Sequence, residues 1–431
     1  MDLWHLHSLL RSHARARRMR WGDRAALEQH QARGLARFAA HVLPRSPYFR
    51  AVCDRPIAQW PTMDKATMMR HFDSMNTAGL RLDEVLACAL RAETSRDFRP
   101  SIGRHSVGLS SGTSGGRGVF VVSREEQAQW AGVMLAKLLP RGLWRRERIA
   151  LFLRANSNLY TSVRTPWLSF QFFDLLQPFD TLLGQLEAYR PSIVVAPAQV
   201  LRSLALARQT GRVSVTPRRV ISAAEVLDPM DRALVGAVFG EPGEIYQATE
   251  GFLGSTCPHG VMHLNEEFLH IEPQWMDADR FQPLITDFTR WTQPIVRYRL
   301  DDVLVRRAEP CRCGNPAMAI ERIEGRCDDM LLLPGRAGGR VTVFADACAR
   351  AIAQALPLEA DYRLWQTGAE ALRLHVAGGG AALARCQARL AEALDQLGVA
   401  VAGLRWTLCP TLPPNDFTTK RRRILRLKEA V

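Results

Sequence analysis

Ile193-Val194-Val195-Ala196 is a short apolar run, and Val220-Ile221-Ser222 is a second run of the same kind. A segment of helix length with periodic apolar residues separates the two, and a third run, Ile149–Leu153, lies upstream. Short apolar runs that alternate with helical patterns are typical of buried parallel strands joined by helices. The sequence therefore predicts an α/β fold with mixed or parallel sheets in a large N-terminal domain.

The C-terminal part of the chain has a different pattern. Residues 362–365 and 372–376 are strand-like, and an Ala- and Leu-rich helix is expected over residues 381–397. These segments predict a small α+β unit over residues 330–431. The change of pattern coincides with Glu324–Asp329, a joint that contains Gly and Asp and is either an ordinary linker or a hinge.

Length and composition indicate a globular chain with packed cores. It has 431 residues, of which 47% are hydrophobic and 23% are charged. No run of 18 apolar residues occurs, so we expect no membrane-spanning helix. The first residues, Met1-Asp2-Leu3-Trp4-His5, lack the apolar core of a secretory signal. Because the nine cysteines are an odd number, we expect them to be reduced thiols of a cytoplasmic protein.

The charge balance is basic, with 57 Lys and Arg residues against 43 Asp and Glu residues and a net charge of +14. Only four of the basic residues are lysines, and the arginines are spread over the whole chain. This distribution indicates a sequence-wide preference for arginine, and no nucleic-acid-binding motif accompanies it. We expect no nucleic-acid partner, whereas a polyanionic small molecule such as a nucleotide suits the same field.

Leu109-Ser110-Ser111-Gly112-Thr113-Ser114-Gly115-Gly116-Arg117-Gly118 is the most informative segment for chemistry. It holds four hydroxyl side chains and four glycines within residues 110–118. Glycines let backbone amides approach an anion closely, and Ser and Thr hydroxyls add donors to phosphate oxygens. It is not a Walker loop, because no Gly-Lys-Ser/Thr follows at the required spacing. The segment is either a phosphate-binding loop or a flexible hairpin turn.

Two further segments combine aromatic, carboxylate and arginine residues. Ile245–Gly251 contains Tyr246 and Glu250, so it either stacks a base and holds magnesium or forms a surface loop. Pro294–Asp302 places arginines beside paired carboxylates, which form either an ion-pair network or contacts to ribose hydroxyls. Neither segment is specific by itself.

Cysteines and histidines of two separate segments form a candidate metal site. Cys311 and Cys313 belong to a tight Cys-x-Cys knuckle, and Cys257 lies upstream together with His259 and His263. Structural zinc sites are closed, tetrahedral and built from such ligands. We predict that Cys257, His263, Cys311 and Cys313 bind a structural Zn²⁺ that pins the two segments together, with His259 as the alternative histidine. Otherwise they are reduced, buried cysteines beside a surface histidine.

Taken in order, these segments resemble the motifs of the adenylate-forming (acyl/aryl-CoA ligase) superfamily. More narrowly, the chain is similar to the phenylacetate-CoA ligase-like branch, which includes the deazaflavin-coenzyme adenylyltransferases, and the similarity covers nearly its whole length. The matching segments are the phosphate loop Ser110–Gly115, the aromatic-x-x-Thr-Glu motif Tyr246–Glu250, the Arg-Tyr-Arg-x-Gly-Asp motif Arg297–Asp302, the hinge motif Gly325–Asp329, Ser222–Glu225, Pro61–Lys65 and Ser46–Tyr48.

Three departures accompany the resemblance. Gly116-Arg117-Gly118 stands where many members of the superfamily have Pro-Lys, and Asp301 stands where the family usually has Gly. Leu331–Phe344 retains only a trace of the Gly-rich loop that helps to form the thiol tunnel in the ligases. The last departure concerns the thiol-transfer step and not the adenylation step.

The resemblance implies a two-step reaction and a two-domain architecture. A small-molecule carboxylic acid, aryl or fatty, is first joined to the α-phosphate of ATP with release of pyrophosphate. The acyl group then passes to the thiol of CoA or of an acyl carrier protein. A domain over residues 1–325 would bind ATP and the acid. A small mobile domain over residues 330–431 would swing in about a hinge over residues 326–329.

The resemblance also implies where the ATP phosphates, the metal and the pivot lie. The phosphates would be held by hydroxyls and amides of Ser110, Ser111, Gly112, Thr113, Ser114 and Gly115. Thr249 would reach the α-phosphate, and Glu250 would hold the Mg²⁺ that neutralises the leaving pyrophosphate. Asp328 would be the pivot of domain rotation.

For the nucleoside of ATP/AMP, the resemblance implies a pocket on the same domain. Tyr246 would stack on adenine, with Ala224 and Glu225 lining that pocket. Asp302 would accept the ribose hydroxyls, and Arg326 would help there.

The family places a catalytic lysine near the C-terminus, where it stabilises charge that develops between the attacking carboxylate and the phosphate. Lys420 follows the polar loop Pro413–Thr419, in the place the family uses. In a chain that uses arginine almost everywhere, a lysine here is informative, because arginine cannot replace its compact point charge. The alternative is a basic tail, Lys420-Arg421-Arg422-Arg423.

Other outcomes stay open. Adenylyl transfer to a phenolic hydroxyl of a cofactor-like molecule would need no thiol, and a non-catalytic nucleotide-binding module would need no acid. Phe152–Tyr160 and Phe170–Asp174 contain aromatic residues and are candidates for the acid pocket. The oligomeric state is open, with a dimer among the alternatives.

Overall fold

In the computed structural model, the described part of the chain comprises residues 3–95, 97, 100–110, 117–139, 142–143, 146–154 and 168–427. Its α-helices are α1 (Leu3–Arg18), α2 (Arg24–His41), α3 (Lys65–Arg70), α4 (Phe72–Met75), α5 (Leu82–Ser95), α6 (Arg124–Leu138), α8 (Phe179–Tyr189), α9 (Ala198–Gln209), α10 (Pro229–Phe239), α11 (Ala345–Ala353) and α12 (Gly379–Gln396). Its 3-10 helices are η1 (Leu43–Arg45), η2 (Arg50–Val52), η3 (Ile57–Gln59), η4 (Cys327–Asp329) and η5 (Val401–Gly403). None of these helices combines the length and the apolarity needed to cross a bilayer.

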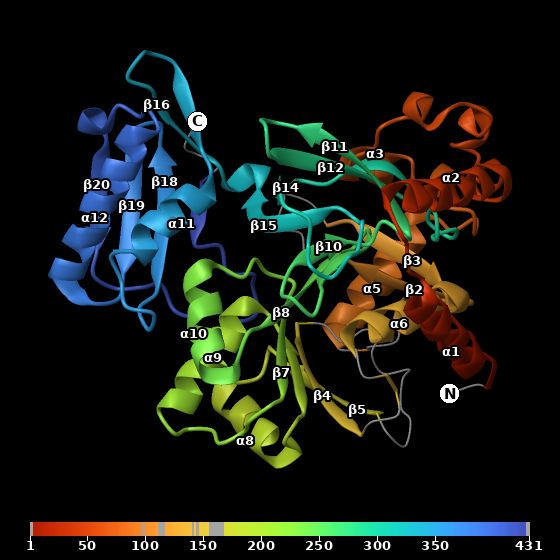
Figure 1. Ribbon diagram of the computed structural model, residues 1–431, viewed down its shortest axis with the longest axis horizontal. Coiled ribbons are helices and arrows are strands. Elements are labelled where there is room, and N and C mark those ends of the chain that lie inside the picture. Colours follow the sequence, from red (N-terminus) through yellow and green to blue (C-terminus); the bar gives the residue numbers. More distant parts are fainter. Residues whose placement is uncertain are drawn as a thin grey trace.

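The strands are β1 (Ser101–Ile102), β2 (His105–Leu109), β3 (Val119–Ser123), β4 (Glu147–Leu153), β5 (Leu168–Asp174), β6 (Ile193–Ala196), β7 (Arg219–Ala223), β8 (Gly243–Ala248), β9 (Gly251–Thr256), β10 (Met262–Leu264), β11 (Leu269–Trp275), β12 (Arg280–Asp287), β13 (Ile295–Arg299), β14 (Asp302–Arg306), β15 (Ala319–Arg326), β16 (Leu331–Pro334), β17 (Arg340–Val343), β18 (Tyr362–Gly368), β19 (Ala371–Val376), β20 (Arg405–Cys409) and β21 (Ile424–Arg426). In Figure 1, the N-terminal helices lie at the right, β4 to β8 at the lower centre, and the C-terminal elements, in blue, at the left.

One large sheet runs through the N-terminal part of the molecule. Its order is β11-β12-β14-β15-β10-β9-β8-β7-β6-β4-β5, with β13 paired to β12. The five strands β5, β4, β6, β7 and β8 are parallel to their neighbours, whereas the pairings from β8 to β11 are antiparallel. The predicted α/β class with a mixed sheet is confirmed, and the three apolar runs of the sequence lie in β4, β6 and β7.

The central parallel strands β4, β6 and β7 carry continuous apolar runs because helices cover both faces of the sheet there. In β6, Val194 and Ala196 pack in one core with α8 and α9, whereas Ile193 and Val195 pack in another core with α6 and Leu9 of α1. Successive side chains of a strand point to opposite faces, so here each of them is buried. This double burial explains why the sequence shows continuous apolar runs at these strands.

Residues 330–427, hereafter the C-terminal unit, have a sheet and a core of their own. Strands β20, β19, β18 and β21 form a four-stranded sheet in that order, and β16 and β17 form a two-stranded hairpin. Helices α11 and α12 pack on the sheet around Tyr362, Leu374 and Leu390, which are fully buried. The strand-like segments 362–365 and 372–376 lie in β18 and β19, and the expected Ala/Leu helix is α12. The α+β pattern of this unit therefore agrees with the sequence prediction.

Helix α1 approaches α6 closely at Gly132. A Cβ atom on Gly132 would lie 2.5 Å from the carbonyl oxygen of Leu9 and 2.8 Å from the backbone nitrogen of His13. Both atoms belong to the α1 backbone, so they cannot move aside without displacing the helix. Gly184, in the middle of α8, has no atom within 4 Å of the same position.

The substitution Gly→Ala should therefore have opposite effects at the two sites. Gly132→Ala should lower the free energy of unfolding by about 1–3 kcal/mol, because a methyl group is forced against backbone. Gly184→Ala should raise it by up to about 1 kcal/mol, because alanine favours a helix interior. Equilibrium urea unfolding followed by tryptophan fluorescence measures both. An unchanged midpoint for Gly132→Ala would contradict the described contact of α1 with α6.

Candidate active site

A cleft of about 1430 Å³ lies at the carboxyl ends of β7 and β8, between the large sheet and the C-terminal unit. The carboxyl edge of the strands is where open α/β sheets bind their ligands. Nine predicted site residues line this cleft: Ser110, Ala224, Glu225, Tyr246, Thr249, Glu250, Asp302, Arg326 and Lys420. Asp328 lies in η4, and Ser111, Gly112, Thr113, Ser114 and Gly115 lie outside the described residues.

The two ends of the predicted phosphate loop are clasped together. The Ser110 amide donates to the Gly118 carbonyl over 2.8 Å, and the Gly118 amide donates to the Ser110 hydroxyl oxygen, also over 2.8 Å. Ser110 is thus an anchor of the loop base. Lys65 passes beside it, since a Cβ atom on Gly118 would lie 3.7 Å from the Lys65 Cγ atom. The clasp fixes where the loop leaves and re-enters the fold.

A hydrogen bond and an ion pair join Tyr246, Asp302 and Arg326 at the wall of the cleft. The Tyr246 phenol donates to Oδ2 of Asp302 over 2.7 Å, and Nε of Arg326 lies 3.7 Å from Oδ1 of Asp302. Burial, and next the charge of Asp302, raise the pKa of Tyr246 well above its ordinary value, so the phenol stays a donor. The group therefore presents a fixed carboxylate to the cleft.

Glu250 lies in the turn between β8 and β9 and is only 9% exposed. Burial raises the pKa of its carboxyl, against the hydrogen bond from the Tyr298 phenol and the nearby charge of Lys65. The buried guanidinium of Arg290 donates to the carbonyls of Thr249 and Glu250, each over 3.1 Å, and to that of Val121 in β3 over 3.2 Å. Arg290 thus ties the Thr249–Glu250 turn to the strand that follows the Ser/Thr/Gly loop.

Ala224 and Glu225 follow β7 directly. Ala224 has a φ of +69°, a left-handed conformation that costs energy for a residue with a Cβ atom. The Glu225 carboxylate accepts hydrogen bonds from Arg154 (2.6 Å), the Gln199 side chain (2.9 Å) and the Arg421 backbone amide (3.3 Å). Glu225 lines the cleft, as the resemblance implies, and its carboxylate joins Arg154 and Gln199 to the backbone of the segment that carries Lys420.

Lys420 projects from the C-terminal unit into the cleft. Burial, and next the positive charge of Arg326, lower the pKa of its ammonium group, against the attraction of Asp302. The side chains of the next residues are not a solvated basic tail, because Arg421 and Arg423 are 7% and 6% exposed and form ion pairs. The structure therefore brings a partly desolvated lysine to the cleft that Glu250 and Asp302 also line.

The candidate acid-pocket segments are only partly at the cleft. Leu153 lines it, and residues 155–167 lie outside the described residues. Phe152 and Phe173 are 0% exposed and stack on each other in the core beneath α8 and α9, with ring centroids 4.5 Å apart. These two members of the candidate segments do not line the cleft, because they point to the face of the sheet that α8 and α9 cover.

Several residues at the site did not follow from the sequence. Lys65 ends the matching segment Pro61–Lys65 and is one of only four lysines, but neither feature predicts that it lies beside the phosphate loop. Arg154, Gln199 and Arg290 hold backbone carbonyls of the site, and nothing in their local sequence distinguishes them from other polar residues.

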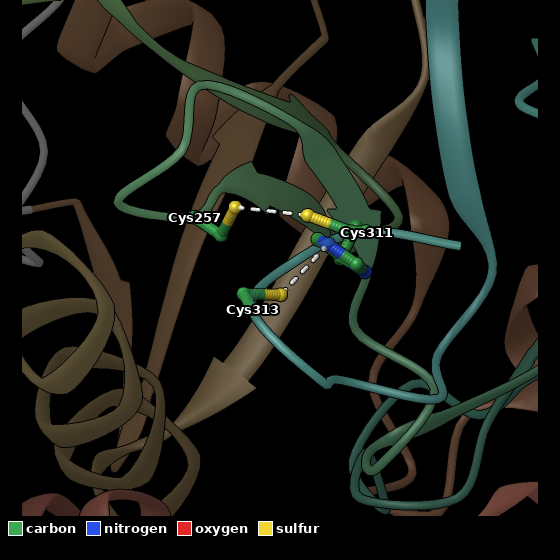
Figure 2. A group of neighbouring side chains, drawn as sticks. Cys257, Cys311 and Cys313 are labelled. Atoms are coloured by element: carbon green, nitrogen blue, oxygen red, sulfur yellow. Dashed lines mark hydrogen bonds between the residues drawn. The ribbon is translucent and has the colours of Figure 1, made fainter. Parts of the chain in front are cut away.

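The structure gathers the four predicted metal ligands Cys257, His263, Cys311 and Cys313, with ligand atoms within 4.8 Å of one another. Figure 2 shows the three cysteine side chains converging. The sulfur atoms of Cys257 and Cys311 are 3.7 Å apart, and Cys313 Sγ lies 3.3 Å from Nε2 of His263. The alternative, His259, is exposed and contributes only its backbone amide, to the Cys257 sulfur.

These distances fit a tetrahedral zinc ion. Bond lengths of about 2.3 Å to sulfur and about 2.0–2.1 Å to nitrogen give ligand separations of about 3.8 Å and about 3.6 Å. The other ring nitrogen of His263, Nδ1, lies 3.1 Å from the Ala317 carbonyl, which favours the tautomer that leaves Nε2 as a ligand. The donor set and its support thus match a closed structural site.

No protein-family model matches this chain, and no curated protein matches it. Among solved structures, it is similar to 2-hydroxyisobutyryl-CoA ligase in the postadenylation state, with a TM-score of 0.66, 14% identity and coverage of 94% of this chain and 90% of that chain. The fold is that of the adenylate-forming ligases. The same ligase in the thioesterification state has a TM-score of 0.53, with 14% identity and coverage of 94% and 89%.

The acyl acid amido synthetase GH3.15 is a further neighbour, with a TM-score of 0.55, 12% identity and coverage of 89% of this chain and 87% of that chain. At such identities the likeness concerns the fold. The activity has to be argued from the residues of the cleft.

The metal site makes a measurable prediction. Freshly purified protein should contain about one equivalent of zinc, and Cys311→Ser should lower both the zinc content and the unfolding temperature, because a closed site contributes folding energy. Cys88→Ser, outside the four-residue group, is the matched control. Elemental analysis by mass spectrometry measures the zinc content of the parent protein and of both variants. A full zinc content in Cys311→Ser would show that the zinc binds elsewhere.

Proposed function

We propose that this protein is an ATP-dependent adenylating enzyme that joins a carboxylic acid to the α-phosphate of ATP and releases pyrophosphate. One observation carries the proposal: Lys420 of the C-terminal unit lines the same cleft as Glu250, Asp302 and Arg326 of the large sheet. Fold likeness to adenylate-forming ligases supports it. A non-catalytic nucleotide-binding module would not need a desolvated lysine opposite these carboxylates.

The residues of the cleft have distinct tasks in this proposal. The Ser/Thr/Gly loop, anchored by Ser110, would hold the β- and γ-phosphates, and Thr249 the α-phosphate. Glu250 would bind Mg²⁺, which neutralises the leaving pyrophosphate. Asp302 would accept the ribose hydroxyls, with Arg326 beside it. Arg290 would keep the Thr249–Glu250 turn and the loop in register.

The adenine pocket needs a revision of the sequence-based roles. Tyr246 would contact adenine with the ring face, since its hydroxyl is engaged by Asp302. Ala224 would approach the base with its backbone, which its left-handed conformation turns away from strand geometry. Glu225 would act mainly on the Lys420 segment, because its oxygens already accept hydrogen bonds from Arg154, Gln199 and Arg421.

Lys420 would stabilise the charge that develops as the acid carboxylate attacks the α-phosphate. A compact ammonium group fits between two small anionic groups, whereas a guanidinium is broad and planar. Low polarity around the lysine strengthens its interaction with that charge. The substrate pocket would be apolar with aromatic walls, for an aryl or fatty acid.

We further propose that the acyl group then passes to a thiol of CoA or a carrier protein, as in the phenylacetate-CoA ligase-like branch. The higher TM-score to the postadenylation state (0.66) than to the thioesterification state (0.53) of one ligase supports an adenylation-type pose for the present structure. Thiol transfer would then require rotation about residues 326–329, with Asp328 as pivot. The Zn²⁺ site would be structural, because it holds two loops together through side chains that no substrate has to reach.

Carboxylate-dependent exchange of pyrophosphate into ATP tests the first step. Over a panel of aryl and fatty acids with Mg²⁺, one class should support exchange, and Lys420→Ala should lower its rate by about 10²–10³-fold, as expected for loss of a charge-stabilising donor. ATP binding measured by calorimetry should change little, since the lysine acts on developing charge.

Lys137→Ala is the matched control, because this lysine pairs with Glu267 away from the cleft. Normal exchange in Lys420→Ala would remove the lysine from the mechanism. ATP binding without exchange for any acid would favour a hydroxyl acceptor or a non-catalytic module.

The pH dependence of adenylation should report the environment of Lys420. Its pKa is lowered from 10.5, mainly by burial, and the lysine has to be protonated to act. The rate should therefore fall as the pH rises through a value below 10.5. The Lys420→Arg variant should have low activity, but it should not show this fall in rate, because arginine stays charged. Initial rates from neutral to alkaline pH, with the zinc content checked throughout, test this prediction. If Lys420→Arg shows the same alkaline fall in rate as the parent protein, the fall belongs to another group.

A further inference from the structure

A carboxylate with no exposed surface lies beneath the cleft, where the C-terminal unit meets α9 and α10. This carboxylate, Asp231, forms ion pairs with three arginines: Arg202 of α9 (3.1 Å), Arg423 (2.8 Å) and Arg421, the last two from the C-terminal unit. Burial acts to raise the pKa of Asp231, but Arg421, Arg423 and Arg202 together outweigh it and lower the pKa, so the group stays ionised.

Arg421 and Arg423 are held by carboxylates of the C-terminal unit and of the large-sheet part of the chain. Arg423 pairs with Asp228, at the start of α10, over 2.8 Å and with Asp361 of the C-terminal unit over 2.7 Å. Asp228 also accepts from the hydroxyl of Tyr362, the first residue of β18, over 3.0 Å. Arg202 reaches across to the Ala360 carbonyl over 2.8 Å. The charged groups therefore alternate between the two parts of the chain.

Apolar contacts reinforce the same boundary. Met230, in α10 of the large part, is 2% exposed and packs inside the core of the C-terminal unit. In the opposite direction, Phe417 packs against the core beneath α8, and its ring centroid lies 5.2 Å from that of Phe179. Each part thus inserts a side chain into the other, which fixes their relative position.

The segment that carries Lys420 is gripped at its backbone. Arg154 and Gln199 donate to the Thr419 carbonyl over 2.5 Å and 2.8 Å, on one side of the lysine. On the other side, the Arg421 amide donates to Glu225. The neighbouring Arg421 side chain reaches Asp231, so Lys420 has both flanking peptide groups fixed.

We propose that Asp231, Arg421 and Arg423 form an ionic latch between the C-terminal unit and the large sheet, and are positioning residues that hold Lys420 in the cleft. The inference deepens the proposed function, on which it rests for the task of Lys420. Removing the C-terminal unit from this pose leaves Asp231 with Arg202 alone, in a place where an underpaired charge is costly. The latch therefore favours the pose that serves adenylation, and any rotation towards a second acceptor has to open it.

Two variants test the latch. Asp231→Asn removes the central charge with little change in shape. Arg421→Gln removes one partner and leaves Asp231 paired with Arg202 and Arg423, so it keeps the test open where Asp231→Asn fails to fold. Arg389→Gln, an exposed residue of α12 that pairs with Glu392, is the control in the same unit.

Hydrogen–deuterium exchange of the nucleotide-free protein gives a readout independent of catalysis. In both latch variants, amides of residues 417–423 should exchange at least about 10-fold faster, as expected for local opening, whereas the β18–β19 and β6–β7 ladders keep their protection. Unchanged protection of residues 417–423 would overturn the proposal. Loss of protection throughout the large sheet in Arg421→Gln would overturn it as well, because the residue would then serve overall stability.

Pyrophosphate exchange with the acid found in the panel gives the second readout. The latch variants should lose up to about 10²-fold in the maximal rate, the effect expected for a misplaced catalytic group, with ATP affinity and zinc content unchanged. Unchanged adenylation together with a freed segment would refute the positioning role. If no acid supports exchange in the parent protein, the proposed function fails, and the hydrogen-exchange result still decides whether the latch exists.

Discussion

A buried negative charge that has to be paired governs how the two parts of this molecule meet. Asp231 has no contact with water, and an isolated carboxylate in such a place costs several kcal/mol. Its arginine partners come from α9 and from residues 421 and 423, which lie some 190 positions further along the chain. Because Lys420 precedes Arg421 directly, the pairing that satisfies the charge also carries the lysine to the cleft.

The mixed sheet supplies the other half of the arrangement. Its parallel strands end at one edge of the sheet, so the residues that follow β7 and β8 lie close together there. Arg290 then joins the turn after β8 to β3 through backbone carbonyls. The cleft is thus assembled from strand ends, one arginine bridge and one imported segment.

Much of this architecture was predictable because it depends on local patterns. The runs in β4, β6 and β7 show burial on both faces, and the strand-like segments 362–365 and 372–376 coincide with β18 and β19. The order of strands in the large sheet was not predictable, since β10 pairs with β15, more than 50 residues away. Nor was the burial of Phe152 and Phe173, because an aromatic residue in a strand does not show which face it will occupy.

The candidate site divides in the same way. Motifs located Tyr246, Glu250, Asp302 and Lys420, and the structure places all four at one cleft. The partners of Glu225 could not be foreseen, because Gln199 and Arg421 are distant in sequence and bond through geometry that only the fold creates. A few arginines, among them Arg202, Arg290 and Arg423, serve as multi-donor partners for buried carboxylates and carbonyls, a task for which lysine is less suited.

The hold on the lysine segment has a consequence for how sequences with this fold diverge. Arg154 and Gln199 contact the carbonyl of Thr419, and Glu225 contacts the amide of Arg421, so the grip acts on peptide groups that every residue possesses. The side chains of Thr418 and Thr419 act differently, because their hydroxyls donate to the Asp416 carboxylate and shape the loop before the lysine. The place of the lysine is therefore encoded less in its sequence neighbours than in Arg154, Gln199 and Glu225, which lie about 200 or more positions away in the chain.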